Sequence, residues 1–144
     1  MTSNYKINYH YPETNVGVIM NDDGILEIHY SENTYTEEEN VAETVWVRDT
    51  LDKIISDYPD IKIYALMDVT SAGDAEEISD ESMKIYSKTM NYPQVKNIAI
   101  FGQTKWFAML LNIMVKLSKT FGKTKLFDDK ENAIAWLKEK KAKR

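Results

Sequence analysis

Hydrophobic and polar residues alternate in the first part of the chain, and this period is typical of half-buried strands. In "YKINYHY", residues 5–11, tyrosine or isoleucine occupies every second position. The stretch "VGVIMNDDGILEIHY", residues 16–30, holds two more strand patterns separated by Asp22, Asp23 and Gly24. Asp-Gly favours a tight hairpin, because glycine accepts the left-handed backbone that such turns need. The pattern therefore predicts an antiparallel opening.

The period then changes to that of a helix. Residues 34–59 place apolar side chains three or four positions apart, with Thr36 and Glu39 spaced as a capping box and Pro59 at the end. The next stretch, "IKIYALMDV" at residues 61–69, is almost continuously apolar. Such a run is typical of a strand that is covered on both faces of a sheet.

Helices and strands continue to alternate after this central strand. A polar loop leads into a helix that Ser79 or Asp80 would cap, and "VKNIAIFG" at residues 95–102 predicts another buried strand. A strongly apolar helix is expected over residues 103–121, ended by Gly122.

The chain closes with a short strand and a helix. "TKLFDD" predicts the strand, and Asp129 is placed to cap the helix that follows. We expect residues 138–144 to fray as a basic tail. An antiparallel opening followed by alternating units predicts a single α/β domain over residues 1–144, with a mixed sheet, largely parallel later strands and about four helices.

Composition narrows the function classes. The net charge of −5 disfavours nonspecific binding to nucleic acid or to an anionic membrane, since both reward clustered Lys and Arg. The absence of cysteine excludes disulfides, thiolate metal sites and cysteine nucleophiles. The sequence has no signal-peptide pattern and no apolar run of about 20 residues. We therefore expect a cytoplasmic protein without a transmembrane segment.

Two segments near the end resemble a known family. "KNIAIFGQTKWFAMLLNIMVKL" and "TKLFDDKENAIAWLKE" combine a strand ending in Phe-Gly, an apolar helix with tryptophan, a short strand and Ala-x-x-Trp-Leu. This pattern, together with the order of elements, is similar to the STAS fold of bacterial anti-sigma-factor antagonists and their divergent relatives. The resemblance implies a regulatory or protein-binding module, and other members of the broader fold bind lipids or apolar ligands.

The resemblance also suggests a phosphorylation site. In the classical antagonists, an acidic or amide residue ends a central strand, and a phosphorylatable serine follows at the start of the next helix. The matching positions here are Asp68 and Ser79, although the usual Asp-Ser-Ser-Gly motif is absent. Ser79 with Asp68 is thus the regulatory site that the resemblance implies.

Candidate catalytic and cofactor residues are sparse. The two histidines, His10 and His29, lie on expected strands, where with Glu27 they could meet across the sheet and bind a metal. No ligand spacing supports that reading, and ordinary sheet-surface positions explain all three residues better. The sequence contains neither a nucleophile-elbow serine nor a glycine-rich phosphate loop. We therefore expect no enzyme, no cofactor and no metal.

The helix expected over residues 103–121 carries more apolar surface than one contact needs. One apolar face of this helix suits packing on a sheet. A second line of apolar residues has no contact assigned to it, and it consists of Ala108, Leu111 and Val115, flanked by Met109. Neighbouring helices, a homodimer partner, an apolar ligand or a membrane surface would each cover this line. The acidic net charge disfavours the membrane surface.

A second candidate contact residue is Trp46. It lies off the apolar face of its helix, where it would pack under the N-terminal strands or serve as an exposed anchor for a partner. The sequence leads to two hypotheses. The first is a non-enzymatic interaction or regulatory module that binds a protein partner or a second copy of itself. The second is a carrier or sensor of a small apolar ligand or lipid, held beside the helix over residues 103–121.

Overall fold

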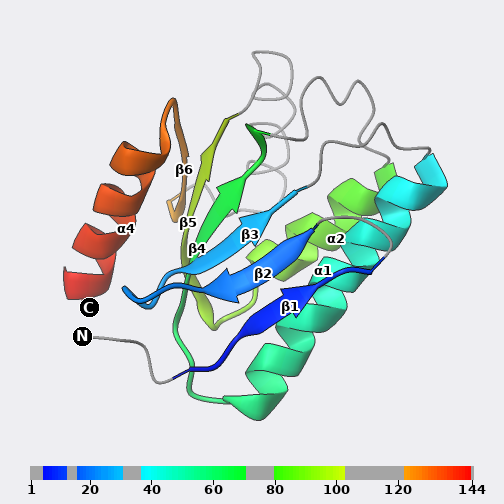
Figure 1. Cartoon of the computed structure of the whole chain (residues 1–144), viewed down its shortest axis with the longest axis horizontal. Coiled ribbons are helices and arrows are strands. Elements are labelled where there is room, and N and C mark those ends of the chain that lie inside the picture. Colours follow the sequence, from blue (N-terminus) through cyan, green and yellow to red (C-terminus); the bar gives the residue numbers. More distant parts are fainter. Residues whose placement is uncertain (1–4, 13–15, 31–36, 71–79, 103–121, 144) are drawn as a thin grey trace.

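The computed structural model of this chain describes residues 5–12, 16–30, 37–70, 80–102 and 122–143. These residues form a six-stranded mixed sheet with helices on both faces (Figure 1). The strands are β1 (Asn8–His10), β2 (Gly17–Met20), β3 (Leu26–His29), β4 (Ile63–Asp68), β5 (Val95–Phe101) and β6 (Thr124–Phe127). The helices are α1 (Glu37–Asp57), α2 (Asp80–Met90) and α4 (Lys130–Lys143).

The strand order in the sheet follows the order in the chain, from β1 to β6. β1, β2 and β3 pair antiparallel, whereas β3 to β6 pair parallel. The predicted α/β class, the antiparallel opening and the parallel later strands are therefore confirmed. The described residues contain three helices rather than about four, and the helix expected over residues 103–121 lies outside them.

The predicted hairpin joins β2 to β3. Gly24 has a φ of 77°, the left-handed conformation that the Asp-Gly signal requires. The side-chain oxygen of Asn21 accepts hydrogen bonds from the backbone N–H groups of Asp23 and Ile25, at 2.9 and 3.0 Å. This side chain therefore closes the turn from within.

Each face of the sheet has its own apolar core. On one face, α1 and α2 cover a large cluster that includes Val18, Ile28, Ile54, Ile98 and Ile100. On the other face, α4 packs on β4 and β5 through a smaller cluster. The members of this smaller cluster are Ile25, Tyr64, Leu66, Ala99, Phe101, Ala133 and Leu137. Burial on both faces explains the continuous apolar run of β4.

The C-terminal helix begins directly after the predicted cap. The carboxylate of Asp129 accepts a hydrogen bond from the backbone N–H of Asn132 at 2.8 Å. α4 runs to Lys143 and so includes most of the basic tail, residues 138–144, whose fraying stays a prediction. Lys138 pairs with the Asp23 carboxylate at 3.3 Å, and Lys141 donates to the Asp23 carbonyl at 2.7 Å. These contacts hold the helix end against the β2–β3 turn.

Candidate functional site

A histidine held between two carboxylates lies on the face of the sheet that α4 covers. The Nε2 atom of His29 is 2.9 Å from Glu27 Oε1, and its Nδ1 atom is 3.1 Å from Asp68 Oδ2. Glu27 and His29 share a face because they are two positions apart on β3. The parallel register places His29 directly beside Asp68 at the end of β4. We call these three residues the histidine clamp.

Further polar contacts hold the Glu27 carboxylate of the clamp. Asn21 Nδ2 donates to Glu27 Oε2 at 2.8 Å, and Lys130 Nζ at the start of α4 is 3.3 Å from Glu27 Oε1. The Glu27 side chain is only 13% exposed. Asp68 accepts a second hydrogen bond from the backbone N–H of Thr70 at 3.0 Å. The clamp therefore connects β3, β4 and α4 through charged groups.

The clamp shifts the pKa values of its members in opposite directions. The hydrogen bond from His29 is the largest cause that lowers the pKa of Glu27, from 4.5 to about 2, while burial opposes the shift. Asn21 and Lys130 lower the pKa of Glu27 further. The hydrogen bond to Glu27 raises the pKa of His29 above 6.5, burial opposes it, and Asp68 adds to the rise. The arrangement favours an imidazolium between two carboxylates.

This geometry restricts the chemistry of His29. Both ring nitrogens of the protonated imidazole donate to carboxylates, so neither offers a lone pair to a substrate or a metal. Among the described residues, no group of three or more His, Cys, Asp or Glu side chains is arranged to hold a metal ion. His10 lies in the same row of the sheet as His29, but Gly17 of β2 separates them. The clamp therefore acts as an electrostatic link between elements.

A buried polar contact joins α1 and α2 on the opposite face. Thr44 Oγ1 donates to Ser82 Oγ at 3.1 Å, and both residues are almost completely buried. The ring of Tyr86 meets that of Tyr30 edge-on, with 6.4 Å between the centroids. Burial raises the pKa of Tyr86 to about 12, so its hydroxyl stays protonated at neutral pH. Ser82 is inaccessible to a modifying enzyme in this position.

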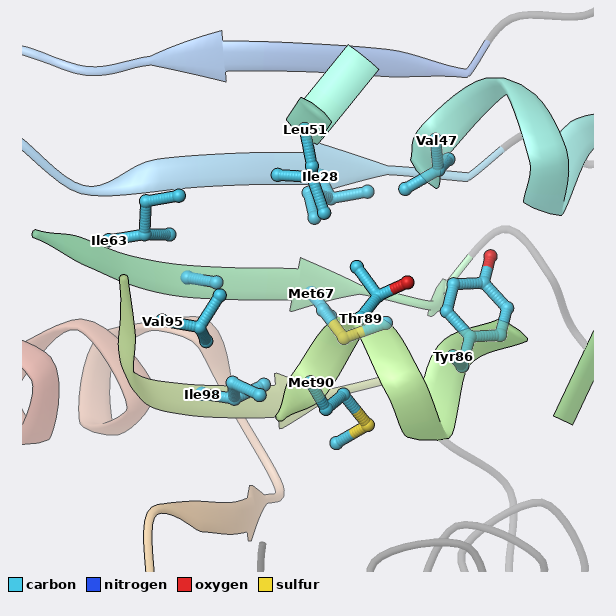
Figure 2. Close-up of a pocket in the computed structure, with 11 residues that line it drawn as sticks. Ile28, Val47, Leu51, Ile63, Met67, Tyr86, Thr89, Met90, Val95 and Ile98 are labelled. Carbon is cyan, nitrogen blue, oxygen red and sulfur yellow. The ribbon is translucent and has the colours of Figure 1, made fainter. Parts of the chain in front are cut away.

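The cavity between the helices and the sheet is small and apolar (Figure 2). Its volume is about 30 Å³. Side chains of α1, α2 and the sheet converge on it, including Val47, Met67, Met90 and Val95. A lipid or a drug-sized ligand needs about ten times this volume. The ligand pocket expected beside residues 103–121 lies outside the described residues.

Val95→Ile is expected to stabilise the fold by about 0.5–1 kcal/mol, because the added methylene fills part of this cavity with apolar surface. Urea unfolding of both proteins measures the difference. Val18→Ile is the matched control, since Val18 is fully buried and does not line the cavity. A Val95→Ile protein that loses as much stability as the Val18→Ile protein would contradict the expectation.

The predicted contact residue Trp46 lies in a row of aromatic side chains between β1 and α1. Its ring stacks on Tyr11, with centroids 5.5 Å apart. At the other end of the row, Tyr5 meets Tyr58 edge-on at 4.9 Å. Between them, Lys53 Nζ is 5.4 Å from the ring centre of Tyr9. All five aromatic residues are half-buried, and we call them the β1–α1 aromatic row.

The other sequence-predicted residues divide between the described and undescribed parts of the chain. Asp68 ends β4 as expected and is engaged by His29. Its proposed partner Ser79 lies outside the described residues, as do Ala108, Met109, Leu111 and Val115. The sequence pointed to His10, His29 and Glu27 as residues that could meet across the sheet, but it missed Asp68 as the third member of the clamp. The sequence signal that could have identified Asp68 is that His29 and Asp68 lie at the ends of two successive strands.

Comparison with protein families gives one match. A model described as a domain of unknown function, DUF7793, matches residues 19–141. The chain belongs to this family. The DUF7793 match begins within β2 and ends within α4, so it includes all three members of the histidine clamp. No curated protein and no solved structure matches the chain. Within the described residues, every helix is too short or too polar to cross a membrane.

Proposed function

We propose that this DUF7793 domain is a non-enzymatic, STAS-like interaction module of bacterial regulatory type that self-associates through the β1–α1 aromatic row. The mixed sheet, with an antiparallel opening and parallel later strands, supports the fold part of the proposal. The position of the clamp imidazole between two carboxylates supports the non-enzymatic part, since it leaves no free base at His29.

The aromatic row is the observation that carries the interaction part. Trp and Tyr are enriched in the energetic centres of protein interfaces, because a rigid apolar ring there carries a polar edge. Five such residues lie along an edge strand and the neighbouring helix, and each keeps part of its surface exposed. β1 is the outer strand of the described sheet, and among the described residues no strand pairs with its far edge.

The charges beside the row favour a second copy of the chain as the partner. Exposed charges of both signs flank the row on α1, with Lys53 between Asp49 and Asp57. In a two-fold dimer the same surface meets itself, so a patch with both signs can be self-complementary. Two antiparallel β1 edges would also continue the sheet across the dimer axis.

Trp46→Ala is expected to raise the dissociation constant of self-association by about tenfold or more, as for a central interface anchor. Sedimentation velocity over a range of protein concentrations measures the constant, and thermal unfolding shows that the variant remains folded. Trp136→Ala is the matched control, because Trp136 is also half-buried but lies on α4.

A wild-type chain that stays monomeric at the highest concentration would refute self-association. Equal weakening by the two tryptophan variants would remove the role of the aromatic row. Leu111→Glu tests the apolar line that the sequence predicts on residues 103–121. If this variant alone dissociates the dimer, the interface involves that line instead.

A further inference from the structure

A second aromatic surface lies at the opposite edge of the sheet, where β6 and α4 are side by side (Figure 1). The rings of Phe127 on β6 and Trp136 on α4 are 5.6 Å apart, at an angle of 52°. Lys125 Nζ is 5.3 Å from the centre of the Phe127 ring, and Lys140 Nζ is 5.7 Å from the centre of the Trp136 ring. We call these four residues the lysine–aromatic surface.

This region has the opposite charge to the chain as a whole. Residues 122–144 contain eight Lys and Arg against four Asp and Glu, in a chain of net charge −5. On the same side of α4, Glu139 is paired with Lys143 at 2.9 Å and also lies within electrostatic reach of Lys140 and Lys125. Three lysines around one carboxylate leave a net positive surface beside the two rings.

The backbone of β6 adds a second recognition element. β6 is the outer strand of the described sheet, next to β5. The backbone N–H of Ile98 donates to the Lys123 carbonyl at 2.8 Å, which fixes the phase of the parallel ladder. In that phase the backbone groups of Lys125 point toward β5, and those of Thr124 and Leu126 point to the outer edge. An added strand would pair with these outward groups.

We propose that the lysine–aromatic surface and the outer edge of β6 bind an extended acidic peptide segment of a protein partner. The peptide adds a strand next to β6, as in other cases of strand addition to a sheet edge. Its acidic side chains point to the α4 face, toward Lys125 and Lys140. Its intervening apolar side chains point to the other face, beside Leu126. This proposal depends on the proposed function in one respect, which is that the domain is a protein-binding module.

The distribution of the lysines favours a peptide over a polyanion. Lys138 and Lys141 are held at the β2–β3 turn, and Lys130 is paired with Glu27, so these three do not join the surface. Strong nucleic-acid binding rests on about six to ten phosphate contacts, and anionic membranes select clusters of about four to eight basic residues. A surface with three lysines and one carboxylate matches a short acidic strand better.

Fluorescence anisotropy with short labelled peptides tests this proposal. One peptide alternates Glu with Val, and its twin alternates Lys with Val. We expect the Glu peptide to bind the full chain about tenfold tighter than the Lys peptide at low salt, and to weaken as salt screens the charges. Lys125→Glu combined with Lys140→Glu should weaken binding of the Glu peptide by about tenfold or more.

Lys84→Glu combined with Lys88→Glu is the matched control, because it makes the same charge change at exposed positions of α2. Equal binding of the two peptides, or equal weakening by the two double variants, would overturn the proposal. Tighter binding of phosphatidylserine vesicles or of a thymidine oligonucleotide, with displacement of the peptide, would also overturn it. If Lys125→Glu with Lys140→Glu abolishes self-association, a second copy occupies the surface instead. Trp46→Ala should leave peptide binding intact, which separates this proposal from the proposed function.

Discussion

Gly102→Ala is expected to lower the free energy of unfolding by about 2–4 kcal/mol. Gly102 follows β5 and has a φ of 87°, a conformation that costs an alanine about 1–2 kcal/mol. A Cβ atom there would also lie 2.7 Å from the backbone nitrogen of Thr70 and 2.8 Å from its Cα. These backbone atoms of Thr70 cannot move away without disturbing the end of β4. The steric clash therefore adds to the free-energy cost of the left-handed conformation.

Chemical denaturation of Gly102→Ala and Gly122→Ala measures this effect against a matched control. A Cβ atom at Gly122 meets no atom within 4 Å. Gly122→Ala should therefore change stability by less than about 0.5 kcal/mol. Equal stability of the two variants would show that the close approach of Gly102 and Thr70 is not needed for the fold. The same region holds Asp68, so we also expect Gly102→Ala to loosen the histidine clamp.

His29→Ala is expected to destabilise the fold by about 1–3 kcal/mol near pH 6. The substitution removes the cation between Glu27 and Asp68, and leaves Glu27 with Asn21 and Lys130 as its remaining partners. Because the His29 side chain is 31% exposed, solvent screening keeps the loss below that of a fully buried ion pair. His10→Ala is the control, since His10 is exposed on the edge strand. A similar loss in the two variants would argue against the clamp.

The pH dependence of stability gives a separate test of the clamp. The folded-state pKa of His29 is raised, so its contribution is complete below about pH 6.5 and is lost as the pH rises through the folded value. The folded-state pKa of Glu27 is lowered to about 2, so its contribution is present above about pH 4.5 and is lost as the pH falls toward 2. The clamp therefore stabilises the wild type most between about pH 4.5 and 6.5.

Unfolding experiments that extend from this range to higher pH should show a steeper loss of stability above pH 6.5 in the wild type than in His29→Ala. An NMR titration of the His29 ring should give a midpoint above 6.5, the ordinary value. Parallel stability curves for the two proteins above that pH would contradict the assigned role. In that case the contacts of His29 would contribute equally to the stability of the fold whether the imidazole is charged or neutral.

Local patterns in the sequence predicted most of the architecture. Asp-Gly at the β2–β3 turn, the apolar run of β4 and the cap at Asp129 each depend on a few neighbouring residues, and each is confirmed. The contacts at the end of α4 were not predicted, because Lys141 donates to the carbonyl of Asp23, which is 118 positions away in the chain. A contact across that distance leaves no trace in local periodicity.

The candidate site was less predictable for the same reason. Glu27 and His29 share a face of β3 because they are two positions apart, but the register between β3 and β4 decides that Asp68 completes the clamp. Register between parallel strands depends on how both faces pack, and one sequence does not determine it locally. Trp46 was recognised as lying off the apolar face of its helix, whereas its stacking on Tyr11 depended on where β1 pairs.

The agreement between strand order and chain order has a consequence for how the domain folds. Each strand pairs with the strand that precedes it, so the sheet can grow by one strand at a time as the chain emerges during synthesis. Such neighbouring pairings keep each loop closure shorter than a pairing between strands that are further apart in the chain. The long-range contact between Lys141 and Asp23 can form only after α4 has been made. We therefore expect that contact to complete the native state, with the early hairpin serving as the docking point for the last helix.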